Sequence, residues 1–172
     1  MNAAQQSYSG TVIRSPLQFV RDYEFARVIV WDALLDSVLV SGWLAEASIT
    51  PEVGGEYNLQ WLHRSGQPMS FGRIVGLVAL EQLQVDTSNI GRLEFTLEEL
   101  SGGNRGTGTR LRLAIDYPTD LMLAAGVMAD WLTSLDQLED LLHGHPVDWG
   151  NWDRDRHDAW TRHFEETGHS TG

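Results

Sequence analysis

The sequence contains no cysteine and no lysine, since all twelve basic residues are arginines. The absence of cysteine excludes disulfides, thiolate metal sites and cysteine nucleophiles, and it fits a reducing cytoplasm, where we expect the protein. The absence of lysine excludes Schiff-base chemistry and a phosphate-loop lysine. Several large classes of enzyme are therefore excluded before any motif is considered.

Long hydrophobic runs and basic patches are also missing. No apolar stretch approaches the roughly 20 residues needed to span a bilayer, and the N-terminus lacks the pattern of a signal peptide. The formal charge of −12 repels phosphate backbones and anionic lipid, so we expect neither nucleic acid nor a membrane as partner. The 172 residues, 42% of them hydrophobic, suffice for one domain with its own core.

The first third of the chain is predicted to contain a strand and two short helices. Residues 1–10 are polar and predict a disordered arm, whereas Leu17–Tyr23 predicts the first strand. Apolar residues recur at helical spacing in the first helix: Val28, Trp31, Leu34 and Leu35. Asp36 is placed to cap the second helix. The predicted buried side of that second helix consists of Val38, Leu39, Trp43 and Leu44.

The middle of the chain alternates apolar and polar residues, which predicts antiparallel strands. One parity from residue 57 carries Tyr57, Leu59, Trp61 and His63. Further strands are predicted over Phe71–Leu80, Leu83–Thr87, residues 93–97 and residues 111–117. The last two pair about a glycine-rich tip at residues 101–108. Symmetric pairing puts Glu98 opposite Arg110, where we expect a cross-strand ion pair.

The longest helix is predicted to begin after Pro118-Thr119-Asp120 and to end at Gly144. Its first half is apolar almost all round, and its second half narrows to one stripe: Trp131, Leu135, Leu138 and Leu142. A helix that is covered on most sides has this pattern. The order of elements therefore predicts an α+β fold in which the sheet covers the helix.

The C-terminal extension, residues 146–172, is rich in aromatic residues and histidine. Trp149, Trp152, Trp160 and Phe164 recur at helical spacing, which predicts a short amphipathic helix over residues 151–166. This helix packs either on its own domain or, in a homodimer, on a second subunit. The histidines of the region have no metal-ligand spacing, so we expect no metal: His143, His145, His157, His163 and His169.

Several motifs in a fixed order resemble one family. They are Val30-Trp31-Asp32-Ala33-Leu34, Gly42-Trp43-Leu44, Val53-Gly54-Gly55-Glu56-Tyr57, Phe71-Gly72-Arg73-Ile74, Gly108-Thr109-Arg110-Leu111-Arg112-Leu113 and Trp131-Leu132-Thr133-Ser134-Leu135. The chain resembles the bacterial stand-alone domains homologous to the C-terminal domain of the activator of heat-shock protein 90 ATPase, in the START-like superfamily. This resemblance implies a helix-grip fold over residues 11–145: a curved antiparallel sheet of six to seven strands wraps around the long C-terminal helix, and two short helices follow the first strand.

The resemblance also favours an internal ligand cavity over a solid core. Residues whose parity places them on the concave face or the facing helix are the predicted lining: Trp43, Tyr57, Leu59, Trp61, His63, Phe71, Phe95, Leu113, Met128 and Trp131. Gly126 and Ala125 are expected to leave room beside them. Tyr57 and His63 are the polar candidates in this lining.

The preferred hypothesis is a non-enzymatic pocket for a small hydrophobic ligand, aromatic or lipid-like, without a cofactor. One alternative is an enzyme similar to polyketide cyclases and aromatases, with Tyr57 or His63 as acid or base. That enzyme requires a second pocket group, such as Arg112 or Asp116 turned inward. Another alternative is an interaction or stress-response module that acts through its surface.

Overall fold

The computed structural model describes residues 12–13, 17–62, 68–102, 106–116, 119–152 and 154–169. Its largest sheet has five antiparallel strands in the order β2-β8-β7-β6-β5. The strands are β2 (Leu17–Tyr23), β5 (Gly72–Val78), β6 (Gln82–Thr87), β7 (Arg92–Ser101) and β8 (Thr107–Asp116). Consecutive strands from β5 to β8 pair with one another as antiparallel hairpins. β2, which comes first in the chain, pairs with β8 at the edge of the sheet opposite β5.

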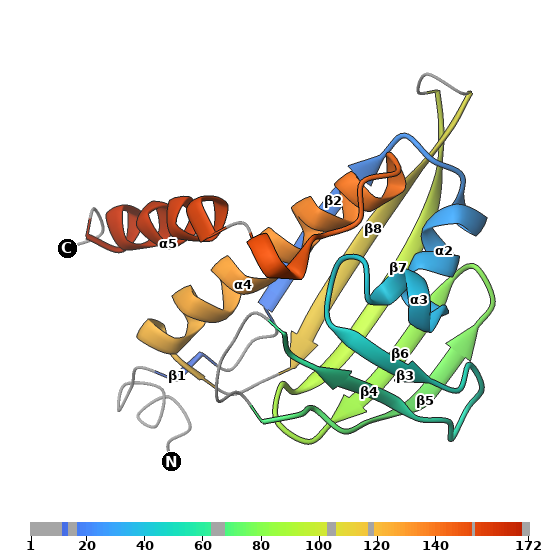
Figure 1. Ribbon diagram of the computed structural model, residues 1–172, viewed down its shortest axis with the longest axis horizontal. Helices are drawn as coiled ribbons and strands as arrows, with labels where there is room; N and C mark the ends of the chain where they lie inside the picture. Colours follow the sequence, from blue (N-terminus) through green and yellow to red (C-terminus); the bar gives the residue numbers. More distant parts are fainter. Residues whose placement is uncertain are drawn as a thin grey trace, which may run out of the picture.

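Two further strands extend this sheet beyond β5. β3 (Glu46–Ile49) and β4 (Tyr57–Gln60) form an antiparallel ladder, and single bridges at Glu56–Arg73 and Leu59–Ser70 connect it to the β5 side. β3 was not predicted, because four residues are too few for a clear alternation. β1 (Val12–Ile13) pairs with β9 (Thr119–Asp120). The curved sheet of five plus two strands confirms the predicted helix-grip architecture (Figure 1).

The two short helices are α2 (Arg27–Leu35) and α3 (Ser37–Val40). Asp36 caps α3 as predicted, since its carboxylate accepts hydrogen bonds from the Val38 and Leu39 amides. The predicted buried side is partly wrong, because Val38 is 80% exposed. α3 ends after one turn, so helical spacing does not carry on from Val38 to Trp43. Val28, in the first turn of α2, is exposed as well.

Helix α4 (Leu121–Leu142) lies across the sheet, and Gly144 ends it as predicted (Figure 1). Gly144 has a φ of +88° and donates its amide to the Leu141 carbonyl. A short 3₁₀ turn, η2 (Trp149–Asn151), and α5 (Arg154–His169) follow. α5 packs on α4 of the same chain. No helix in the described part of the chain is long and apolar enough to cross a membrane.

The register of the β7–β8 hairpin is as predicted, with Glu98 opposite Arg110. The predicted ion pair is wrong. Strand β8 lies between β7 and β2, so Arg110 also stands opposite Asp22 of β2. The Arg110 guanidinium binds the Asp22 carboxylate with both Nε and an Nη. A hydrogen bond from Arg110 lowers the pKa of Asp22 below its ordinary value. Glu98 instead lies 3.9 Å from Arg112.

Candidate functional site

The interior between the sheet and α4 is closed at one end by side chains that bind the end of α2. Trp43 Nε1 donates to the Ala33 carbonyl at 2.8 Å, and the Tyr57 hydroxyl donates to the Leu34 carbonyl at 2.7 Å. The last carbonyls of a helix have no partner within the helix, so these bonds satisfy groups that would otherwise be buried unpaired. Trp43, Tyr57 and Leu34 are fully buried here.

Tyr57 therefore has a structural role in the protein. Its hydroxyl proton is committed to Leu34, and burial raises its pKa above the ordinary value of 10.0. A phenol that stays neutral and hydrogen-bonded is a poor general base at neutral pH. The prediction that Tyr57 is an inward-facing polar residue is correct, but the geometry gives it no acid or base function.

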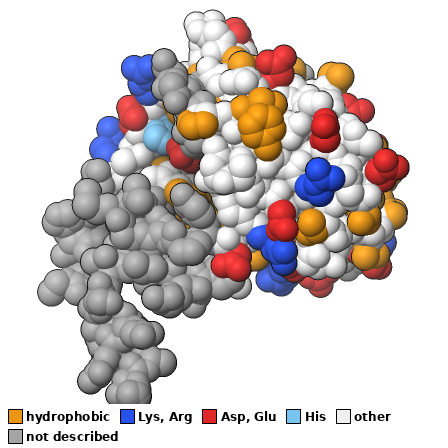
Figure 2. All heavy atoms as spheres, turned by 90° about the horizontal axis from the view of Figure 1, so that it is seen from below, with side chains coloured by type: hydrophobic (Ala, Val, Ile, Leu, Met, Phe, Trp, Pro, Cys, Tyr) orange, Lys and Arg blue, Asp and Glu red, His pale blue; other side chains and the backbone are white. Residues whose placement is uncertain are grey.

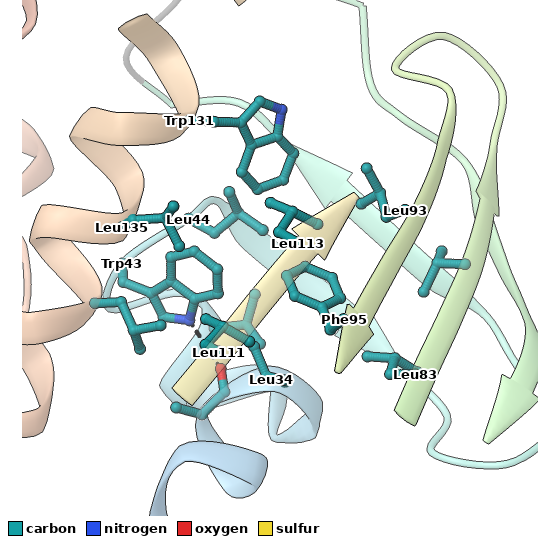
Figure 3. Close-up of a cluster of buried hydrophobic side chains, with 14 of the residues drawn as sticks. Leu34, Trp43, Leu44, Leu83, Leu93, Phe95, Leu111, Leu113, Trp131 and Leu135 are labelled. Carbon is teal, nitrogen blue, oxygen red and sulfur yellow. Dashed lines mark hydrogen bonds between the residues drawn. The ribbon is translucent and has the colours of Figure 1, made fainter. Parts of the chain in front are cut away.

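α4 is held firmly along its second half. Tyr23 of β2 donates its hydroxyl to the Leu135 carbonyl at 3.0 Å, and Gln137 Nε2 donates to the Trp43 carbonyl at 3.0 Å. Leu135 and Leu138 are buried against the sheet side of the helix. Figure 3 shows Leu135 beside Trp43 and Leu44. Trp131 lies one turn earlier in α4, and its ring points toward Leu93 and Leu113. We call Leu135–Leu142 the anchored segment.

The part of α4 about two turns before the anchored segment is less covered. Val127 and Met128 are only partly buried although they pack against the core. Gly126 is exposed, and a Cβ added there would meet no atom within 4 Å. The expectation that Gly126 leaves room inside the domain is wrong, because the free space beside it faces solvent. We call Gly126–Met128 the open segment.

Two polar side chains fix the ring of Trp61, which follows β4. Trp61 Nε1 donates to Ser70 Oγ at 3.0 Å, and Ser70 Oγ donates in turn to Asn89 Oδ1. Ser70 is fully buried, and its backbone exchanges two hydrogen bonds with Leu59. The Trp61 ring is therefore a fixed wall whose polar atom is already satisfied.

Most of the predicted lining faces the interior. Seven side chains are buried there: Trp43, Tyr57, Leu59, Trp61, Phe95, Leu113 and Trp131. Met128 is partly buried, and His63 lies outside the described residues. Phe71 was predicted to face inward and does not, since it is 61% exposed. It precedes β5, whose buried residue is Ile74, so Phe71 has the opposite parity. A bulge between Ile74 and Gly76 further obscures the alternation of this edge strand.

The outer surface differs from the interior in composition. On the face shown in Figure 2, hydrophobic side chains are interspersed with Arg, Asp and Glu. A hollow of about 280 Å³ lies on the outside of β2, β8 and β7, and another of about 410 Å³ lies between α2 and the β5–β6 hairpin. Leu113 is the one predicted pocket residue that borders either hollow.

Arg112 and Asp116, which the cyclase-like alternative required inside, are both exposed on β8. Their outward orientation follows from the alternation of β8, where Leu111, Leu113 and Ile115 occupy the inner face. The enzyme hypothesis in that form is contradicted. Within the described part of the chain, no group of three or more His, Asp or Glu residues could hold a metal ion.

Sequence reasoning missed the polar residues around the aromatic rings. Ser70 and Asn89 carry no alternation signal, because each lies in a short irregular segment. Ser134 is buried on α4 and was detectable, since it lies three residues after Trp131 and four before Leu138. A helical projection of the apolar stripe would have placed it on the flank of the core.

The family comparison gives the class of protein. Residues 25–143 match the family described as "Activator of Hsp90 ATPase homolog 1-like protein", which is most of the chain, and the protein belongs to this family. The match ends at the close of α4, so η2 and α5 lie beyond it. No curated protein matches the sequence.

Solved structures share the fold at low sequence identity. CalU16 from Micromonospora echinospora has 21% identity and a TM-score of 0.57, covering 87% of this chain and 88% of its own. EF2215 from Enterococcus faecalis, described as a conserved protein of unknown function, has 14% identity and a TM-score of 0.66, covering 94% and 88%. DynU16, from the dynemicin biosynthetic locus, has 17% identity and a TM-score of 0.60, and the match covers 77% of this chain and 49% of DynU16.

Proposed function

We propose that the protein binds a small hydrophobic ligand, aromatic or lipid-like, between the sheet and α4. The observation that carries this proposal is the unequal covering of one apolar interior. Trp61 and Trp131 are each only 5% exposed, yet Val127 and Met128 of the helix above remain partly uncovered. A ligand beside these two rings would remove further apolar surface from water, which is favourable by about 25 cal/mol per Å².

The hydrogen bonding of the interior favours binding over catalysis. Trp43, Tyr57 and Trp61 each use their polar atom in a bond to the protein. An acid or base must reach its substrate with a free proton or lone pair at a suitable pKa, and these residues offer none. CalU16 and DynU16, the latter from the dynemicin biosynthetic locus, share the fold, which supports a biosynthetic product as the ligand class.

The test is titration with a dansyl-labelled fatty acid and with quercetin, followed by fluorescence. We expect a dissociation constant in the micromolar range for at least one probe, corresponding to roughly 8 kcal/mol. Trp61→Ala should weaken binding at least tenfold, whereas Val38→Ala, a change at an exposed site on α3, should not. Absence of binding by every probe would contradict the proposal.

A second variant separates loss of the site from loss of the fold. Met128→Trp adds volume at a partly buried position instead of removing a contact. If the ligand lies under the open segment, this variant should lose probe binding while it keeps the melting temperature of the unaltered protein within a few degrees. Unchanged affinity in Met128→Trp would place the probe elsewhere.

A further inference from the structure

The described interior contains one buried hydroxyl that has no partner. Five polar residues are buried in the described part of the chain: Ser70, Thr109, Thr133, Ser134 and Gln137. Four of them make side-chain hydrogen bonds to Asn89, Phe25, Ala129 and Trp43 respectively. Ser134 is 6% exposed and makes none with any described residue. Buried polar groups in folded proteins are almost always paired, so this exception calls for a physical cause.

The position of Ser134 connects it with the proposed ligand site. It lies three residues after Trp131 and four before Leu138, both buried, so it shares their side of α4. Gln137, three residues further on, donates to the Trp43 carbonyl, which places this flank of the helix toward the segment that follows α3. Ser134 therefore lies between the anchored and open segments, at the border of the apolar interior.

The neighbouring Thr133 shows that the helix can satisfy such a group by itself. The Thr133 hydroxyl donates back to the Ala129 carbonyl at 2.8 Å, which is the usual solution for a hydroxyl inside a helix. The Ser134 hydroxyl could donate in the same way to the Asp130 carbonyl, one turn earlier, but it makes no such hydrogen bond. The hydroxyl is thus kept available for a partner from outside the helix.

We infer that Ser134 is the polar anchor of the ligand, which therefore combines an apolar body with one hydrogen-bonding oxygen. This inference rests on the proposed function and narrows its ligand class from any hydrophobe to phenols, alcohols, ketones and similar oxygenated molecules. A site that pairs one polar group with apolar walls rejects an analogue lacking that group, because the protein's hydroxyl then stays unpaired. Ser134 acts as a specificity-determining residue.

The test compares naphthol with naphthalene, which differ by one hydroxyl, in calorimetric or fluorescence titrations. We expect the protein to bind naphthol about fivefold more tightly, as one net hydrogen bond allows. Ser134→Ala should abolish this preference, mainly by weakening naphthol. The matched control Thr133→Val removes the adjacent, already bonded hydroxyl and should leave the preference intact.

Thermal unfolding of the ligand-free variants gives an independent readout. Removal of a hydroxyl that makes a structural hydrogen bond should lower the melting temperature, whereas removal of an unpaired hydroxyl should not. Alanine is also a better helix former than serine. We expect Ser134→Ala to melt at or above the temperature of the unaltered protein. A clear decrease would assign Ser134 a structural role and overturn the inference.

The outcomes separate the two proposals. Equal binding of naphthol and naphthalene, or a preference that survives Ser134→Ala, overturns the role of Ser134 and leaves the hydrophobic site standing. Failure of both compounds, together with failure of the fatty acid and quercetin, overturns both proposals.

Discussion

The anchored and open segments of α4 differ in how the protein holds them. In the anchored segment, Leu135 and Leu138 are buried. The Leu135 carbonyl accepts a hydrogen bond from Tyr23 of β2, and the Gln137 side chain donates one to the Trp43 carbonyl after α3. In the open segment, Val127 and Met128 pack on the same core yet stay partly exposed. The anchored segment is therefore held by hydrogen bonds to other elements as well as by apolar contact.

This difference teaches how a helix-grip domain can be stable and still accept a ligand. Trp43, Tyr57 and Tyr23 bind carbonyl groups at the ends or along the length of helices, which fixes one end of the interior. Near Trp131, the apolar contacts of α4 are joined by a hydrogen bond between Asp130 Oδ1 and His157 Nε2 of α5 at 2.7 Å. The proposed ligand site therefore predicts that mutations in the anchored segment affect mainly stability and mutations in the open segment affect mainly binding.

The C-terminal extension reinforces the anchored segment from outside. Trp152 Nε1 donates to Gln137 Oε1 at 2.9 Å, and Trp160 Nε1 donates to Asp136 Oδ2 at 3.0 Å. Asp136 also pairs with Arg21 of β2 at 2.6 Å, so its carboxylate joins three elements. These bonds join the aromatic extension to its own domain, which is one of the two packings that the sequence predicts.

The largest expected effect is in Leu138→Ala compared with Met128→Ala. Leu138 is fully buried, so its truncation should lower the free energy of unfolding by about 3 kcal/mol, whereas truncation of the partly buried Met128 should cost about 1 kcal/mol. Urea denaturation measures both. Equal losses would remove the distinction between the two segments.

Gln137→Leu tests the hydrogen bonds of the anchored segment. The change leaves the Trp43 carbonyl buried without its donor and removes the acceptor of Trp152, and it should cost about 2 kcal/mol. Gln60→Leu, at an exposed position of β4, is the control and should change little. A loss no greater than the control's would mean that these bonds do not hold the helix.

Two glycines sharpen the comparison from the backbone. Gly126→Ala meets open space in a helix and should raise the free energy of unfolding by up to about 1 kcal/mol. At Gly42 an added Cβ would lie 2.8 Å from Leu141 Cδ1, so Gly42→Ala should destabilise the protein. Melting temperatures that move in the same direction for both variants would contradict this.

The smallest effect concerns the outer face of the sheet. Arg110 lowers the pKa of Asp22, so this pair adds stability above the ordinary carboxyl pKa of 3.8, and the contribution is lost as the pH falls through the lower folded pKa. Because the pair is exposed, Asp22→Asn should lower the melting temperature at pH 7 slightly and flatten its decline below pH 4. A large loss would show that surface charge rivals the helix contacts.

Much of the fold was predictable because it follows from local signals. The alternation in β7 and β8 fixed their register, Asp36 marked the start of α3, and Gly144 marked the end of α4. The faces of irregular segments were not predictable. Val38 lies in a helix of one turn and Phe71 lies before a bulged edge strand, so neither has neighbours that continue its pattern.

Partners between distant segments were beyond the sequence pattern. Arg110 stands opposite Asp22 of β2 and Glu98 of β7 at the same time. Which of the two carboxylates it binds depends on the arrangement of the neighbouring strands and cannot be predicted from the alternation pattern. Trp61 is supported by Ser70 and Asn89, and the strands β5 and β6 separate these two residues in the chain. Apolar lining follows from periodicity, whereas the polar groups that orient it depend on tertiary contacts.

Hydrogen exchange of α4 with and without the bound probe tests the central claim most directly. The account predicts that peptides covering the open segment exchange faster in the free protein and slow markedly when the probe binds, while the anchored segment is protected in both states. Slowing confined to the anchored segment or to the outer strands, with the open segment unchanged, would contradict a ligand site beneath it.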